Sequence, residues 1–142
     1  EQHACSLAGR LPVLHLSTAA GPITYSVGAA PSAIWRGQVL MRCGPAFDLG
    51  GQPSLGSTAQ NRVVIDGLAT NPEAWQGCTT LLGNSSAIGQ SVQELAGSAR
   101  RPFSACLDGS GFRIALRLAQ EIPAERGRSQ RISSERLVSP VI

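Results

Sequence analysis

The sequence contains no lysine, so its 12 basic residues are all arginines. Lys–Asn isopeptide bonds and covalent attachment through a lysine amine are therefore excluded, and any polymer that this chain joins must be non-covalent. Charged residues make up only 15% of the chain and aromatic residues 4%. Proteins that bind nucleic acid usually cluster basic residues and interleave them with aromatics. The nearest cluster here, Arg126, Arg128 and Arg131, lies in a polar segment predicted to be a loop, so no nucleic-acid partner is expected.

Long apolar runs are also absent from the sequence. No stretch approaches 18 uninterrupted apolar residues, so no membrane span is predicted. The first nine residues, EQHACSLAG, contain neither the basic segment nor the apolar segment of a signal peptide. We therefore expect that a signal peptide has already been removed.

Histidine is scarce, and this limits the catalytic chemistry available. The segment DGSG (108–111) is superficially similar to a serine-protease nucleophile loop, which needs a histidine base and an acidic partner. His3 lies near the start of the chain and His15 in an alternating segment, so DGSG is predicted to be a hairpin turn. The acidic residues, among them Glu94, Asp108, Glu121 and Glu125, show no spacing typical of a glycosidase pair or a calcium loop. We expect no enzyme activity, no metal and no cofactor.

The residues that are plentiful favour short strands. Gly 16 and Pro 9 supply frequent turns, and a hydrophobic content of 42% argues against disorder. A length of 142 residues fits one domain with one core, and we take residues 1–142 as a single domain. Alternating apolar and polar residues predict roughly seven short strands, which suggests an all-β sandwich. The strands are expected on either side of Gly21-Pro22 within 11–27, and within 34–43, 62–66, 83–95, 112–119 and 131–142.

Individual positions in these strands carry more detailed predictions. Val39, Met41 and Cys43 share one face of 34–43, which is expected to lie in the core. Asp66-Gly67 is predicted to be a turn. Pro140 favours a sheet edge for the last strand. The clearest alternation is FRIALRLA (112–119), in which Arg113 and Arg117 are predicted to face solvent. Its opposite face, predicted to be core, consists of Phe112, Ile114, Leu116 and Leu118.

Four cysteines, Cys5, Cys43, Cys78 and Cys106, form no C-x-x-C motif and have no histidine pair nearby, which disfavours zinc or redox chemistry. Two disulfides are the better interpretation, although three connectivities are open. Disulfides persist in oxidising compartments, so the chain is expected to be extracytoplasmic.

Trp35, Trp75 and Tyr25 could form a platform that stacks against a sugar ring, because aromatic faces cover the apolar C–H surface of sugars. Trp35 is expected to pack in the core. Trp75, in a predicted loop with Asn71 and Gln76, is the better ligand-binding candidate, because amide groups there could bond to hydroxyls. Asn84-Ser85-Ser86 matches a glycosylation acceptor, a pattern that is common by chance.

The order of these features resembles the pilin domain of chaperone-usher fimbrial subunits. The family has an early Cys bridged to a second Cys about 40 residues later, and here Cys5 and Cys43 are 43 − 5 = 38 apart. The segments GQVLMRC (37–43), NRVVIDG (61–67), GNSSAIGQSVQELAGSARRPF (83–103) and FRIALRLA (112–119) are similar to successive family segments. The resemblance covers nearly the whole chain, but each piece is common in small secreted β domains.

The resemblance implies an immunoglobulin-like sandwich, incomplete by one strand and without enzymatic activity. A periplasmic chaperone would fill its groove before a neighbouring subunit's strand does so at the usher, giving a fimbrium on the cell surface that serves cell adhesion. The resemblance also implies a Cys5–Cys43 disulfide. Joining the remaining neighbours along the chain then gives a Cys78–Cys106 disulfide.

Several features of the chain depart from the family. Only four residues precede Cys5, the usual penultimate Tyr is absent, and a second Cys pair is not typical. Either the chain only accepts a strand, as a tip or adhesin subunit would, or a donor extension has been removed. The alternative is a secreted binding or inhibitor module that recognises a glycan or a protein through surface loops.

Overall fold

A computed structural model describes residues 5–52, 59–70, 72, 93–95, 102–107, 113–123 and 129–138. The regular elements in these residues are all β-strands, so the all-β prediction is confirmed there. The chain forms two compact units, Glu1–Asp66 (unit 1) and Gly67–Ile142 (unit 2). The strands are β1 (Arg10–Thr18), β2 (Gly21–Ala29), β3 (Gln38–Gly44), β4 (Gln60–Leu68), β5 (Gln93–Leu95), β6 (Phe103–Leu107), β7 (Ile114–Pro123) and β8 (Ser129–Val138).

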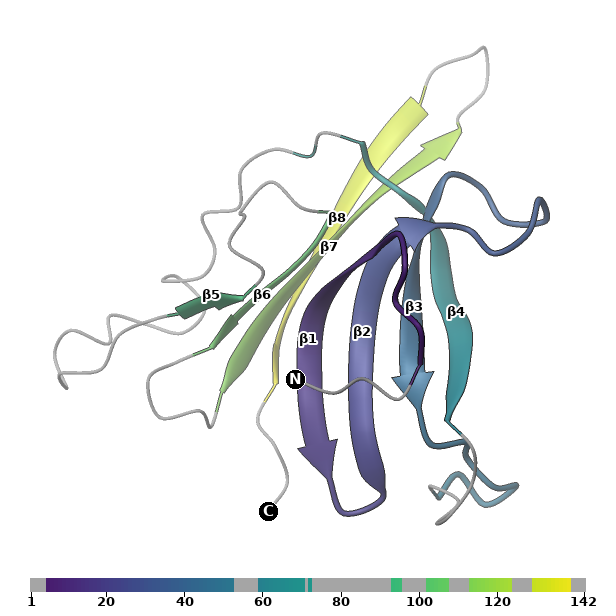
Figure 1. Ribbon diagram of the computed structural model, residues 1–142. Helices are drawn as coiled ribbons and strands as arrows, with labels where there is room; N and C mark the ends of the chain where they lie inside the picture. The colour runs from purple at the N-terminus through teal and green to yellow at the C-terminus, as the bar shows by residue number, and fades with distance from the viewer. Residues whose placement is uncertain are drawn as a thin grey trace, which may run out of the picture. The chain divides into compact units, whose positions relative to one another are not determined.

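Unit 1 is a meander in which each strand neighbours the next in the order β1-β2-β3-β4 (Figure 1). The β1–β2 and β2–β3 pairs are antiparallel. The predicted strand pair within 11–27 is confirmed, but the turn lies at Ala19-Ala20 and not at Gly21-Pro22. Gly21 has φ +131°, which glycine adopts readily, so β2 can begin directly after a two-residue turn.

The core of unit 1 confirms the predicted face of β3. Val39, Met41 and Cys43 are all buried, and Leu40 on the other face is buried as well. The strand itself begins at Gln38, later than the Ile34 expected from sequence. Trp35 precedes it and has 36% of its surface exposed, so the prediction that Trp35 packs in the core is wrong.

The Cys5–Cys43 disulfide is present, with the two Cα atoms 6.1 Å apart. It ties the segment before β1 to the end of β3. Cys106 is fully buried in β6, but Cys78 lies outside the described residues, so the Cys78–Cys106 pairing stays a prediction. One disulfide indicates an oxidising, extracytoplasmic environment.

Strand β4 extends past the predicted turn at Asp66-Gly67. Gly67 has φ +65° and lies within the strand, which continues to Leu68. A glycine in the left-handed region can bend a strand without ending it. The turn prediction at this position is therefore wrong, because the local signal marked an irregular strand residue.

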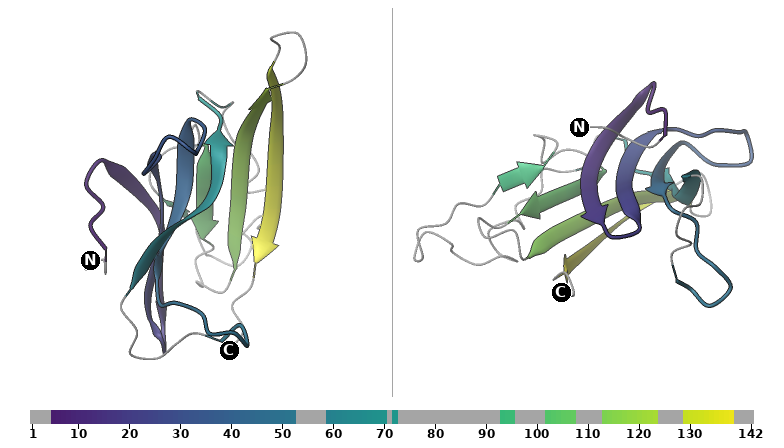
Figure 2. Two further views of the ribbon diagram at one scale, coloured as in Figure 1. Left: turned by 90° about the vertical axis from the view of Figure 1, so that its right-hand side faces the viewer. Right: turned by 60° about the horizontal axis from the view of Figure 1, so that its bottom comes forward.

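Unit 2 is arranged around β7, which has β6 on one edge and β8 on the other (Figure 2). β5 pairs with β6, and Leu68 at the end of β4 pairs with Gln120 of β7. β6 and β7 are antiparallel, as a hairpin at DGSG requires, although residues 108–112 themselves lie outside the described residues. β6 was not predicted as a separate strand. The final strand was predicted, and it forms β8.

The two faces of β7 differ from the prediction. Ile114 is buried as expected, but Leu116 and Leu118 are only half-buried, and Arg117 is buried with 4% of its surface exposed. Ala115 and Ala119 are buried on the same face as Arg117. Small alanines leave room for a long arginine stem, whose apolar carbons pack well. The prediction that Arg117 faces solvent is therefore wrong, and Phe112 lies outside the described residues.

The immunoglobulin-like sandwich and the single domain stay predictions. No helix in the described residues is long and apolar enough to span a membrane.

Candidate functional site

Strand β8 is exposed along the whole of its described length. It pairs with β7 over ten consecutive positions, from Ile114–Val138 to Pro123–Ser129, without a bulge. Every side chain from Gln130 to Val138 is nevertheless exposed, on both faces of the strand. Within the described residues its ladder partner is β7, so β8 forms an edge of the sheet.

The backbone of β7 shows which groups of β8 point outward. The Ala119 amide donates to Pro102 O at 2.7 Å, and Ala119 O accepts from the Ala69 amide at 2.9 Å. Ala119 therefore directs both backbone groups away from β8. In an antiparallel ladder its direct partner, Ser133, must then also point its N–H and C=O away from β7. Leu137, four residues later, points the same way because the direction repeats every second residue.

A side-chain contact on β8 agrees with this assignment. The Arg136 Nη1 group donates to the backbone oxygen of Glu135 at 2.9 Å. Glu135 is two residues from Ser133, so its carbonyl also points outward, where a side chain can reach it. Charged side chains at an edge discourage indiscriminate pairing with other chains. The charges on β8 therefore limit which strands can pair with its edge.

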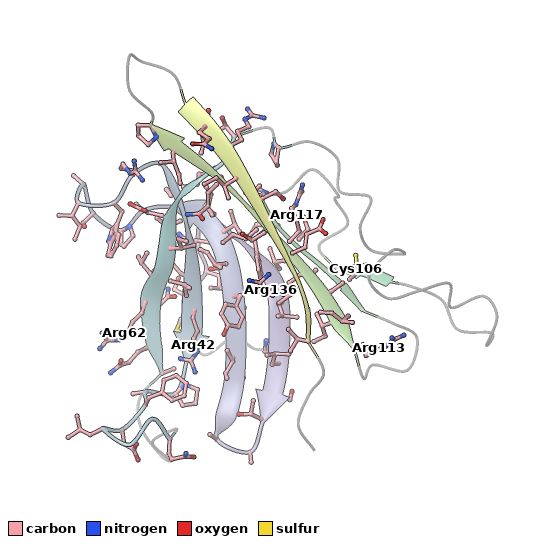
Figure 3. All side chains as sticks on the ribbon, turned by 180° about the vertical axis from the view of Figure 1, so that it is seen from behind. Arg42, Arg62, Cys106, Arg113, Arg117 and Arg136 are labelled. Carbon is pink, nitrogen blue, oxygen red and sulfur yellow. A yellow bond between two sulfur atoms is a disulfide. The ribbon has the colours of Figure 1, made fainter. Side chains whose placement is uncertain are left out.

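Three polar residues lie side by side across β6, β7 and β8 in the observed register. Ser104 on β6, Arg117 on β7 and Glu135 on β8 are direct partners in the two ladders. Arg117 Nη2 donates to Ser104 Oγ at 3.4 Å. Burial lowers the pKa of Arg117, and the charge of Glu135 opposes this by raising it. A slip of one residue would separate the buried guanidinium from Glu135, so the row favours the observed register. Figure 3 marks Arg117 and Arg136 on neighbouring strands.

Apolar side chains accompany the charges along β8. Ile132, Leu137 and Val138 are each between 39% and 45% exposed. They lie on both faces, because Leu137 alternates with Ile132 and Val138. An incoming strand could therefore add backbone hydrogen bonds at the edge and cover apolar surface beside it. Such strand addition is a common mode of peptide recognition.

The structure places few of the catalytic candidates considered from sequence. The His15 Nδ1 atom forms a hydrogen bond with Thr24 Oγ1 at 2.8 Å within the β1–β2 pair. Glu121 is half-buried on β7. In the described residues no group of three His, Cys, Asp or Glu side chains could hold a metal ion. Outside the described residues, or with undescribed side chains, are His3, Glu94, Asp108, Ser110 and Glu125.

The structure does not describe the residues that were predicted to bind a ligand. Trp75, Asn71 and Gln76 all lie outside the described residues, as does Asn84, so these predictions are untested. The β8 edge was not identified from sequence as a site. Its sequence, SQRISSERLV, mixes charged with apolar residues on one strand, and this mixture was the available signal.

Comparisons with known proteins supply no family: no family model, no curated protein and no solved structure matches this chain.

Proposed function

We propose that this chain is a non-enzymatic subunit of a bacterial surface fimbria, which binds neighbouring subunits by β-strand addition. The observation that carries the proposal is the edge of β8, a ten-residue strand whose backbone at Ser133 and Leu137 points away from β7 and has no ladder partner among the described residues. The Cys5–Cys43 disulfide supports it, because a bridge of this spacing is a feature of the pilin domains that the sequence resembles.

Within this proposal the fold is an immunoglobulin-like sandwich that lacks one strand. A periplasmic chaperone protects it in transit, and an usher exchanges the chaperone for a neighbouring subunit. An exposed strand edge is an aggregation hazard in water, which gives a physical reason for a chaperone. The mature location is the fimbrium at the cell surface.

Immunogold electron microscopy of cells that produce the chain tests the proposal. Antibodies against the chain should label surface fibres. The Ser133→Pro variant should fold but should be absent from the fibres. Proline removes an outward N–H group and places its ring at the edge of the sheet, so a neighbouring strand could not pair there. Ser133→Ala is the matched control, since it keeps the N–H and should enter fibres normally.

Two outcomes would count against the proposal. Labelling confined to dispersed secreted protein, with no fibres, would remove the fimbrial role. Fibres that contain Ser133→Pro at the normal level would show that the β8 edge is not the assembly surface.

A further inference from the structure

Unit 1 contains a pocket of about 320 Å³ that has no part in the proposed assembly. It is lined by Arg42 from β3, by Ala46 and Phe47 just after β3, and by Gln60 and Arg62 from the start of β4. Figure 3 shows Arg42 and Arg62 on these neighbouring strands, at the end where β3 finishes and β4 begins. The volume is at the lower end of the range for pockets that bind small molecules.

The Arg42 guanidinium is held in place by its surroundings. Its Nη1 group donates to Pro45 O at 3.1 Å, and its Cζ atom lies 4.6 Å from the centre of the Phe47 ring. A Cβ atom at Gly44 would lie 3.4 Å from Arg42 Cζ and Nη2, so the backbone passes close to the guanidinium. The neighbouring Cys43 is fixed by its disulfide. Arg42 is therefore pre-oriented, with its Nε and Nη2 donors unused by the described residues.

Arg62 supplies a second oriented guanidinium. Its Nε group donates to Gln60 Oε1 at 2.6 Å, which leaves both Nη groups for another acceptor. The same bond occupies Gln60 Oε1 and leaves the amide nitrogen of Gln60 as a donor. The pocket thus presents two planar cations and one neutral donor. Guanidinium groups bind carboxylates and phosphates through paired N–H donors.

The charge of the two arginines is not balanced by the acidic side chains that the structure describes in unit 1. Asp48 Oδ1 accepts hydrogen bonds from the Gly50 and Gln52 amides, both at 2.9 Å, and closes its own loop. Asp66 Oδ2 accepts from the Arg36 amide at 2.9 Å and lies 4.0 Å from Arg36 Nε. These two carboxylates are therefore engaged away from the pocket.

The remaining arginine that the structure describes in unit 1 is used structurally. Arg10 donates to Ser26 and to the backbone oxygens of Ala29 and Val39. Arg42 and Arg62 thus stand apart from Arg10 and Arg36: neither forms an ion pair in the described residues, and both line one concave surface. Two unneutralised charges in one pocket favour binding of an anion.

We propose that this pocket binds an organic anion about the size of a monosaccharide. Its acidic group lies against the guanidiniums of Arg42 and Arg62. Its apolar carbons cover Phe47, a residue that is 55% exposed, and a hydroxyl accepts from the Gln60 amide. The ligand class is an acidic sugar, with a carboxylate or a phosphate as the shared oxyanion chemistry.

Titration calorimetry of the full chain at low salt, with five probes, tests this proposal. The probes are glucuronate, glucose 6-phosphate, glucose, acetate and inorganic phosphate. Glucuronate or glucose 6-phosphate should bind at least ten times more tightly than glucose, and more tightly than the small anions that cannot cover Phe47. Which of the two sugars binds better distinguishes a carboxylate from a phosphate ligand.

Variants then locate the bound anion. Arg62→Gln should weaken binding of the acidic sugar at least tenfold, and Arg62→Lys should weaken it less, because it keeps the charge without the fork of donors. Arg36→Gln is the matched control: it removes the same charge from unit 1 outside the pocket and should change the affinity less than twofold.

Three results would overturn the proposal. They are the absence of binding by both acidic sugars at millimolar concentration, equal affinity for glucose, and equal losses in Arg62→Gln and Arg36→Gln. If inorganic phosphate binds as tightly as the acidic sugars, the pocket binds an adventitious ion only and does not recognise a sugar. Amide chemical shifts of folded Arg62→Gln, unchanged outside the pocket, would exclude misfolding as the cause of a loss.

Discussion

Among single residues, Arg117 shows how a charged side chain can be part of a core. It is buried between alanines on β7 and donates to Ser104 on β6. Burial lowers its pKa, so the charge is held at a cost in desolvation. Glu135 on the neighbouring strand reduces that cost. The side chain therefore favours one register of the sheet more clearly than it adds to stability.

Replacing Arg117 separates these contributions. Arg117→Ala should lower the free energy of unfolding by about 1 to 3 kcal/mol, because it empties the volume of the buried stem. Arg117→Met fills that volume without a charge and should be at least about 1 kcal/mol more stable than Arg117→Ala. Urea unfolding followed by circular dichroism measures both. Equal stabilities would mean that the stem does not pack as the structure describes.

Arg10 is a second residue whose role the structure defines. Its guanidinium bonds to Ser26 Oγ at 2.9 Å, Ser26 O at 3.1 Å, Val39 O at 2.8 Å and Ala29 O at 2.6 Å. It thereby joins β1 to β2 and β3.

Substitution of Arg10 should weaken these links between strands. Arg10→Ala should cost about 2 kcal/mol of unfolding free energy, since several charge-assisted bonds are lost. Arg10→Lys should recover less than half of this, because one ammonium cannot reach all four acceptors. As a control, Arg36→Ala at an exposed ion pair should stay within about 0.5 kcal/mol. A loss at Arg36 as large as that at Arg10 would contradict this account.

At the scale of elements, neighbouring serines on β8 provide a matched test of the edge. Ser134 alternates with Ser133, so its N–H points toward β7 and belongs to the ladder. Ser134→Pro should destabilise the protein by about 2 kcal/mol or more, because it removes a ladder bond and leaves an acceptor on β7 unpaired. Ser133→Pro should cost less than about 1 kcal/mol. Thermal unfolding measures the difference, and a reversed order would place the outward edge on the other residues.

Strands were predictable from sequence where alternation coincides with the core. Val39, Met41 and Cys43 alternate and are buried, so β3 was found and its buried face was right. β7 was predicted too, but the wrong face was expected to be buried. The alternation pattern assigns charged residues such as Arg117 to the solvent face. Hydropathy does not register that flanking alanines leave space for an arginine stem.

Turns and sites were less predictable because they depend on contacts between distant segments. Gly67 follows Asp66 as in a hairpin turn, yet its left-handed φ lies within β4. The pocket joins Arg42 with Arg62, 20 positions later, and no spacing rule connects them. The Cys5–Cys43 bridge was predictable, but through a family resemblance and not from geometry.

On the scale of the whole molecule, the two proposed surfaces belong to different units. The anion pocket lies in unit 1 and the β8 edge in unit 2. Their functions should therefore separate by mutation. Arg62→Gln should enter fibres at the normal level, and Ser133→Pro should bind an acidic sugar with unchanged affinity. Quantitative immunogold labelling measures entry into fibres, and calorimetry measures binding of the acidic sugar. Loss of both functions in either variant would contradict the separation.

The Cys5–Cys43 disulfide should contribute more to stability than any other single feature of unit 1. It closes a loop of 38 residues, for which chain entropy predicts about 4 kcal/mol. That amount is comparable with much of the net stability of a small domain. The Cys5→Ala/Cys43→Ala double variant should therefore melt roughly 10 °C or more below the parent chain. This variant leaves Cys78 and Cys106 in place, so the change belongs to one bridge. A difference of less than about 2 °C between the double variant and the parent chain corresponds to roughly 0.5 kcal/mol. Such a small difference would show that the strands hold the loop without the bridge.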